Sequence, residues 1–230
     1  GQHMNQPDKL DQEALSHSKR YMGKFAWLTV FYGISVCGSY LMIVALAMLG
    51  KLPLLMAFPL VALLTYLTYT LLHEAAHGSI SGSRKSLRWV NEALGYMAAW
   101  ILMIPLTAHR HEHLAHHRHT NEPDGDPDYA ASGLGGNIQQ ALRVPFGILA
   151  GQWTYYRHHR WTKAPPRQNL YLCLEIVIAI VPRLALIMSG LWFEGLVLFV
   201  LAWWLGLMIT LYLFAYLVHR PHNNVGRYVD

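Results

Sequence analysis

Long apolar runs alternate with polar segments along the chain. Four runs of at least 20 residues contain few charges: 25–49, 53–72, 170–189 and 191–218. A helix rises ~1.5 Å per residue, so about 20 residues cross the ~30 Å hydrocarbon core of a bilayer. The pattern predicts an all-α membrane protein with four transmembrane helices.

A fifth apolar run, at 93–106, is too short to cross a bilayer and predicts an interfacial or re-entrant helix that ends at Pro105. Only short turns connect the first run with the second and the third with the fourth. The runs therefore predict two antiparallel helical hairpins, joined by a histidine-rich cytoplasmic segment. We divide the chain into a tag remnant at 1–4, a leader at 5–24 and a transmembrane histidine-box domain at 25–222.

Composition and charge agree with a membrane protein. Hydrophobic residues make up 53% of the chain and charged residues 13%, about half of the ~25% that is usual in soluble domains. The net charge is +5, and most basic residues lie in the leader and between the second and third runs. By the positive-inside rule, both termini and this middle segment are cytoplasmic. No basic motif with interleaved aromatic residues accompanies the charge, so we expect no nucleic-acid partner.

Some residues of the leader and the spans have structural interpretations. The first 24 residues contain no apolar core, so no signal peptide is expected. Cys37 and Cys173 lie inside predicted spans, where we expect buried structural thiols and no disulfide. Glu175 and Arg183 interrupt the third run near its ends, and we expect both to reach the membrane interface and to act structurally.

Histidines gather at the cytoplasmic ends of the predicted spans. His73-Glu-Ala-Ala-His77 places two imidazoles on one helical face, one turn apart. The segment 113–117, His-Leu-Ala-His-His, forms a second set, and a further histidine follows the last run. Because both hairpins end at the same depth, we expect these side chains to converge on one metal site. The predicted ligands are His73, His77, His113, His116, His117 and His219.

A second group of residues could bind the metal or orient a ligand through a hydrogen bond, since metal-bound imidazole usually donates its outer N–H to a carboxylate or another acceptor. Asp126 and Asp128 could accept such a bond, although Asp-Gly-Asp-Pro is also a strong turn sequence. His158 and His159 lie beside two arginines and favour a membrane-contact patch instead. The second group consists of His109, His111, His119, His222, Asp126 and Asp128. Imidazole suits iron, zinc, copper and nickel alike, so the ligand type does not identify the metal.

These motifs resemble those of the membrane fatty acid desaturase and hydroxylase superfamily, which includes carotenoid ketolases and hydroxylases. The pair at 73–77 and the set at 113–117 match two of its histidine boxes. The segment 117–128 is similar to the continuation of the second box in bacterial desaturases. The segment 218–222 resembles the end of the last span in the carotenoid enzymes. The resemblance covers roughly residues 53–222.

The resemblance implies a fold, cofactors and a reaction. Members are four-span enzymes whose histidines hold two iron ions at the cytoplasmic face, and zinc can replace iron after overexpression. O₂ is the co-substrate, which the ferrous ions reduce to an oxidant that removes hydrogen from an unactivated C–H bond. The implied reaction is desaturation of a long-chain fatty acyl or lipid substrate that enters from the bilayer. The alternative is hydroxylation or ketolation of a carotenoid or alkyl chain by the same centre.

The resemblance also implies a partner and a place in the cell. Electrons would come from a donor such as a ferredoxin or a cytochrome, docked on the basic inner face. We expect a multi-pass protein of a bacterial inner membrane. One motif of the family is absent: a third box, His-x-x-His-His, follows the last span in other members, and nothing like it follows His222. We interpret the chain as a truncated version, with weak metal binding and no activity as it stands.

Two functions of other classes fit part of the pattern. His73-Glu74-Ala-Ala-His77 also satisfies His-Glu-x-x-His, in which two histidines bind zinc and the glutamate is the general base of an intramembrane protease. This interpretation needs one further ligand and leaves the histidines at 113–117 unexplained. The second alternative is a metal transporter with a histidine-rich inner loop. A transporter should carry polar ligands near mid-bilayer, however, and the centres of these runs contain almost none.

Overall fold

The computed structural model describes the backbone of residues 6–110, 137–159 and 166–219, and the side chains of 27–110, 137–151 and 166–213. These residues form helices and connecting turns, with no β-strand among them. The elements are α1 (Gln6–Met48), α2 (Leu54–Ala76), the 3₁₀ turn η1 (Lys85–Leu87), α3 (Arg88–Leu102), α5 (Ile138–His159), α6 (Pro166–Met188), α7 (Trp192–Gly195), the π-helical turn η3 (Leu196–Leu201) and α8 (Ala202–His219).

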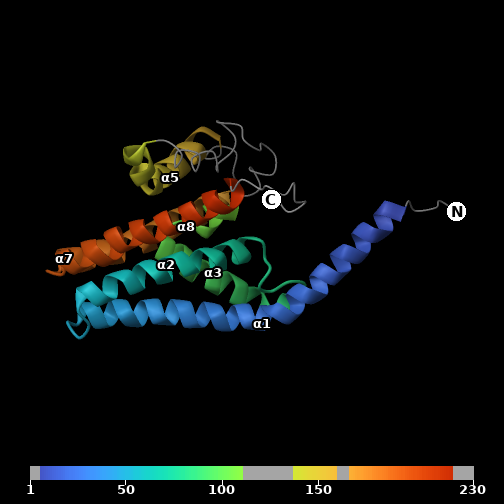
Figure 1. Cartoon of the computed structure of the whole chain (residues 1–230), viewed down its shortest axis with the longest axis horizontal. Coiled ribbons are helices and arrows are strands. Elements are labelled where there is room, and N and C mark those ends of the chain that lie inside the picture. Colours follow the sequence, from blue (N-terminus) through green and yellow to red (C-terminus); the bar gives the residue numbers. More distant parts are fainter. Residues whose placement is uncertain (1–5, 111–136, 160–165, 220–230) are drawn as a thin grey trace.

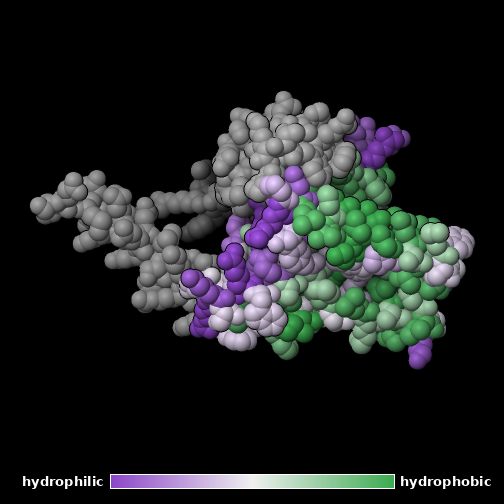
Figure 2. All heavy atoms as spheres, turned by 180° about the vertical axis from the view of Figure 1, so that it is seen from behind, coloured by the Kyte–Doolittle hydropathy of each residue, from purple (hydrophilic) through white to green (hydrophobic). Residues whose placement is uncertain are grey.

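Four segments are long and apolar enough to cross a membrane, as the hydrophobic pattern predicts. They are Trp27–Met48, Leu54–Ala76, Pro166–Met188 and Trp192–Leu213. Helices α1, α2 and α8 lie side by side, and α2 and α8 end at the same end of the bundle (Figure 1). On the face shown in Figure 2, most of the coloured surface of the helices is hydrophobic, and hydrophilic atoms gather mainly near one end. The prediction of an all-α protein with four candidate spans is confirmed.

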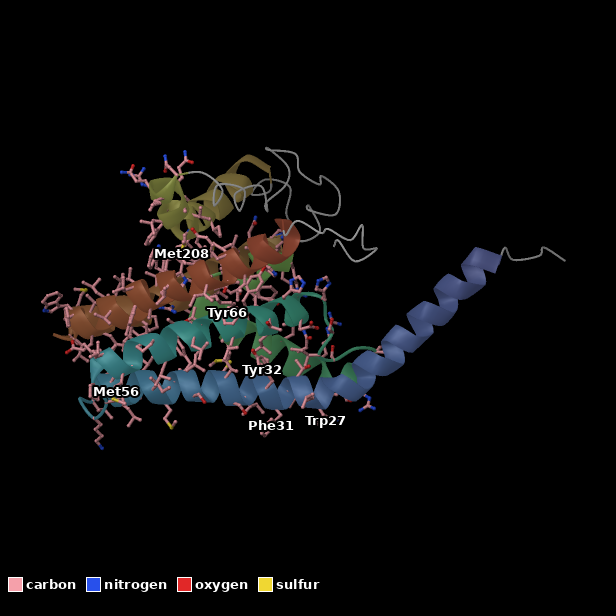
Figure 3. The ribbon with its side chains drawn as sticks, in the orientation of Figure 1. Trp27, Phe31, Tyr32, Met56, Tyr66 and Met208 are labelled. Atoms are coloured by element: carbon pink, nitrogen blue, oxygen red, sulfur yellow. The ribbon has the colours of Figure 1, made fainter. Side chains whose placement is uncertain are left out.

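Small residues and side-chain hydrogen bonds hold the helices together. Gly206 of α8 lies so close to α2 that an added Cβ would stand 2.7 Å from the Ala62 carbonyl oxygen and from the Thr65 Cβ. Membrane helices commonly use glycine for such close approach. Between α1 and α2, the Tyr32 hydroxyl donates to the Leu67 carbonyl at 2.7 Å. Tyr32 faces α2, while Trp27 on the same helix points away from the bundle (Figure 3).

The short apolar run at 93–106 forms α3, which enters the bundle rather than lying flat on it. The helix begins at Arg88 and ends at Leu102, where Met103 takes a left-handed conformation with φ 54°. The end therefore precedes Pro105 instead of coinciding with it. The Trp203 indole N–H of α8 donates to the Leu102 carbonyl at 2.5 Å. This buried bond fixes the end of α3 against α8.

For Arg183 of α6, the expectation that its side chain extends to the membrane interface is wrong. Its side chain does not extend to the membrane interface but is buried, with 5% of its surface exposed. The guanidinium lies 3.9 Å from the centre of the Trp100 ring and donates to the Trp100 carbonyl at 2.6 Å. Carbonyls at the end of a buried helix need such partners, because an unpaired buried polar group costs free energy. The charge is structural, as expected, but its partner is the end of α3.

Helix α5 was not predicted, because its apolar residues form one face of a helix and not a continuous run. Ala141 and Val144 on this face are buried. The Trp204 indole N–H of α8 donates to the Leu142 carbonyl at 2.8 Å, and the rings of Phe146 and Trp203 lie 5.5 Å apart. Helix α5 therefore packs along α8 (Figure 1).

The two cysteines differ in their surroundings. Both are free thiols, and Cys37 is buried, as predicted. Cys173 is exposed, so the prediction of a buried thiol is wrong there. The reason is that α6 contacts the bundle along a narrow face, with Leu172, Ala179 and Arg183 as its buried residues. Cys173 lies outside this face.

Candidate metal centre

Two imidazoles stand together in the last turn of α2 and the residue that follows it. The four-residue spacing places His73 and His77 on one face, with ring centres 4.6 Å apart and 3.2 Å between their Nε2 atoms. Two imidazole nitrogens that bind one ion at ~2.1 Å stand roughly 3.0–3.4 Å apart for ligand angles between a right angle and the tetrahedral angle. The donor type and the separation of this pair therefore both fit a transition-metal ion.

A third imidazole joins this pair from the segment after α3. The His109 ring centre lies 5.8 Å from that of His73 and 6.0 Å from the Tyr69 ring, and Tyr69 in turn stacks near His73 at 6.3 Å. From the sequence, His109 was predicted only as a member of the second group, because no local spacing relates it to His73. The turn of the chain after α3 brings the two rings together.

Glu175 of α6 fixes the segment that carries His109. Its Oε1 accepts the Leu106 backbone N–H at 2.6 Å, and its Oε2 accepts that of Thr107 at 3.2 Å. These N–H groups begin the short helical segment 106–110, so no preceding turn of helix supplies acceptors for them. A carboxylate at a helix start also interacts favourably with the helix dipole. Glu175 thus holds the start of the turn that places His109 beside His73.

The end of α2 is fixed by a second set of polar contacts. The Ala75 carbonyl accepts from the buried Asn91 amide at 3.1 Å and from the Arg110 guanidinium at 3.3 Å. Arg110 also pairs with Glu92 of α3 at 2.6 Å. Carbonyls in the last turn of a helix lack partners within the helix, and these donors supply them. Side-chain hydrogen bonds therefore connect the end of α2, near His77, with Arg110, which follows His109.

A cavity of about 590 Å³ lies between α3 and α6 and extends to the segment after α3. Its walls are mostly apolar and include Trp100, Leu172 and Ala108, the residue before His109. Tyr96 and Glu175 also line it.

The predicted ligands lie only partly within the described residues. His73 and His77 are placed together, and α8 carries His219 to the bundle end at which α2 terminates, although its side chain is not described. The others lie outside the described residues: His111, His113, His116, His117, His119, His222, Asp126 and Asp128. Across 27–110, 137–151 and 166–213, no three His, Cys, Asp or Glu side chains surround one point closely enough to hold an ion.

Comparisons with known proteins relate this arrangement to one family. Residues 49–229 match the profile of the family described as fatty acid desaturase. The chain belongs to this family. It is also 26% identical over 219 residues to the sn-1 oleoyl-lipid 12-desaturase of Anabaena variabilis, an alignment that covers 87% of this chain and 59% of that protein. The chain thus spans less than two thirds of the length of this relative. No solved structure matches the chain.

Family membership agrees with the resemblance seen in the histidine motifs. The matched region begins before α2 and continues past α8, so it includes the end of α2 with His73 and His77 and the end of α8 with His219. Fatty acid desaturases are oxidoreductases, and the candidate spans make this member a membrane protein.

Proposed function

We propose that the protein is a membrane-bound, non-haem diiron oxidoreductase that uses O₂ to desaturate a long-chain fatty acyl or lipid substrate. The observation that carries the proposal is the meeting of His73, His77 and His109 at the end of α2, in a chain of the fatty acid desaturase family. The name of the relative, an oleoyl-lipid desaturase, supports a lipid substrate and favours desaturation over hydroxylation or ketolation of a carotenoid or alkyl chain.

The protein's own residues would have separate tasks in this reaction. His73 and His77 would hold metal together with the remaining predicted ligands: His113, His116, His117 and His219. Bound iron would supply the redox chemistry that activates O₂, whereas zinc could occupy the same ligands but has no redox chemistry. Glu175 would keep His109 beside the metal ligands through its two backbone hydrogen bonds. The apolar walls of the cavity would keep water from the hydrocarbon chain.

An electron donor would dock near the end of α2. A hollow of about 600 Å³ beside His77 is lined by four basic residues: Arg84, Lys85, Arg88 and Arg110. Basic residues attract an acidic partner at long range, so a ferredoxin or cytochrome with an acidic face suits this surface. By the positive-inside rule, the same residues favour a cytoplasmic site and cytoplasmic termini. The bacterial relative favours a bacterial inner membrane as the location.

The metal site can be tested by substituting its described histidines in the full-length protein. We expect His73→Ala and His77→Ala to remove most of the iron or zinc that co-purifies, as measured by plasma mass spectrometry. His158→Ala is the matched control, since its position predicts a membrane-contact patch, and it should leave the metal content unchanged. Equal metal content in all variants would exclude this site.

The reaction can be tested by analysing the fatty acids of bacteria that express the full-length protein. We expect new double bonds in membrane acyl chains, lost in His73→Ala. Glu74→Gln separates this proposal from the protease alternative, because a protease would lose its general base, whereas the desaturase should retain both metal and products. Metal-dependent peptide cleavage that Glu74→Gln abolishes, with no change in lipids, would favour the protease.

A further inference from the structure

We propose that Tyr69 of α2 is a positioning residue for the candidate metal centre, and that its ring fixes the orientation of the imidazoles of His73 and His109. Tyr69 belongs to none of the histidine motifs of the sequence, so its place beside both rings is a property of the fold. This role rests on the metal site of the proposed function, since it concerns how that site is held in shape.

The ring of Tyr69 forms a nearly equilateral triangle with two imidazoles. Its centre lies 6.3 Å from that of His73 and 6.0 Å from that of His109, and the two imidazole centres lie 5.8 Å apart. Tyr69 precedes His73 by one turn on the same face of α2, whereas His109 comes from the segment after α3. Tyr69 therefore links an imidazole of its own helix with one from a distant part of the chain.

Both ring contacts of Tyr69 have favourable geometry. The planes of Tyr69 and His73 are inclined by 20°, so these rings are stacked. The planes of Tyr69 and His109 are inclined by 80°, so these rings meet edge to face. Aromatic rings prefer these two arrangements when their centres are ~4.5–7 Å apart, because the ring faces are negative and the edges positive. Tyr69 thus stabilises one particular orientation of each imidazole.

A metal ligand of this type needs such a restraint. The torsion that rotates an imidazole about its bond to Cβ has broad minima, so the side-chain rotamer alone does not fix the ring plane. The metal binds a nitrogen lone pair that lies in this plane, and a rotated ring would direct the lone pair away from the ion. The Nε2 atoms of His73 and His77 stand 3.2 Å apart. Stacking on Tyr69 opposes the rotation of His73 that would separate them.

The surroundings of Tyr69 make it the better supported partner in these contacts. The side chain is half-buried and packs against the hydrophobic core. It lies about two turns before the end of α2, between Thr68 and Leu71, which are fully buried. His73, in contrast, lies in the last turn of the helix, and His109 follows a break in the chain. A ring held by the core therefore orients two rings at less regular positions.

Cobalt binding tests this role without turnover. Metal-free full-length protein is titrated with Co²⁺, whose visible absorption bands depend on the number and arrangement of its ligands. Tyr69→Phe keeps the ring and should bind cobalt with the affinity and the bands of the unchanged protein. Tyr69→Leu removes the ring, and we expect roughly tenfold weaker binding and shifted bands, at the lower end of the ~10–100-fold losses for residues that orient metal ligands.

Tyr66→Leu is the matched control on the same helix. Tyr66 is also half-buried, and within the described part of the chain its ring contacts no histidine. The change should leave the cobalt affinity and bands as they are. The bands separate positioning from a general loss of stability, because unfolding lowers the amount of bound cobalt but does not shift the bands of the protein that stays folded.

Two results would overturn the role of the ring. One is an equal effect of Tyr69→Leu and Tyr66→Leu on cobalt binding, and the other is a loss of affinity in Tyr69→Phe as large as in Tyr69→Leu. If Tyr69→Leu does not purify as a folded protein, Tyr69→Met replaces it, since its flexible side chain fills the space without a ring.

The cobalt titration also distinguishes this inference from the proposed function, because it needs no O₂, electrons or lipid. Cobalt bands that depend on Tyr69, in a protein that changes no lipid, would support the positioning role and contradict the desaturase reaction. New double bonds in membrane lipids, with identical cobalt binding in Tyr69→Leu and the unchanged protein, would support the reaction and reject the role of Tyr69. Absence of cobalt binding to the unchanged protein would contradict both.

Discussion

Two charged residues within a predicted span bind backbone groups rather than each other. Glu175 accepts the N–H groups that begin the segment after α3, and Arg183 donates to the carbonyls that end α3. Ionisable side chains inside a membrane carry a large desolvation cost unless they have partners. At the residue scale, the two side chains therefore have complementary roles. Arg183 binds the backbone before the break at 103–105, and Glu175 binds the backbone after it.

Removal of the Glu175 carboxylate should destabilise the segment that follows α3. Glu175→Leu leaves two N–H groups without acceptors, and we expect the free energy of unfolding to fall by ~1–3 kcal/mol, with a lower content of bound metal because His109 loses its fixed position. Glu175→Gln keeps one acceptor oxygen and should have a smaller effect. Unfolding in detergent and metal analysis provide the measurements.

Glu194 supplies the control for this prediction. It lies in the short helix α7, at the opposite end of the candidate spans from the histidine cluster. Glu194→Gln should leave both stability and metal content unchanged. An equal loss of metal in both proteins would show that Glu175 has no special role in positioning His109.

At the scale of elements, the contact between α2 and α8 sets the relation between the two hairpins. Both helices end on one side, and Gly206 allows α8 to approach the backbone of α2 at Ala62. Van der Waals packing of this kind drives helix association in lipid, where the hydrophobic effect between helices is absent. A change at this contact should therefore shift the end of α8 relative to the histidines of α2.

Gly206→Ala tests the contact with a single added methyl group. The new Cβ would stand 2.7 Å from the Ala62 carbonyl oxygen, closer than such atoms normally approach. We expect overpacking to destabilise the protein by ~1–3 kcal/mol. Gly38→Ala in α1 is the control, because nothing lies within 4 Å of its added methyl group, and it should be neutral or stabilise by up to ~1 kcal/mol. Thermal unfolding of both proteins in detergent measures the difference.

At the scale of the whole molecule, the arrangement of the spans separates a turn-bearing end from a histidine-bearing end. The turns near Lys51 and Ser189 lie at one end of the bundle, and the end of α2 lies at the other (Figure 1). The histidine cluster and the basic hollow belong to the same end. A reducing partner could therefore approach the candidate site from the end of the bundle, and a lipid could approach it from the side.

Cysteine labelling in intact cells should reveal the orientation of this bundle. In a background with Cys37→Ala and Cys173→Ser, we expect Lys51→Cys and Ser189→Cys to react with an impermeant maleimide. Lys85→Cys should react only after the membrane is opened, since the positive-inside rule places it in the cytoplasm. The reverse pattern would contradict a cytoplasmic histidine cluster.

The sequence by itself determined the features that depend on local pattern. Length and hydropathy specified four spans, because crossing a bilayer sets a minimum length for an apolar helix. The spacing of His73 and His77 placed both rings on one face, because helical periodicity is local. The histidine motifs also indicated the family that the comparison with known proteins confirmed.

Only the tertiary structure decided which distant residues meet. The approach of His109 to His73 and the bonds of Glu175 depend on the path of the chain after α3, which no periodicity encodes. Arg183 and Cys173 were misplaced for a related reason: position along a span does not tell which face of the helix packs. Hydrophobic pattern places a residue in the membrane, whereas helix rotation and neighbouring elements determine its contacts.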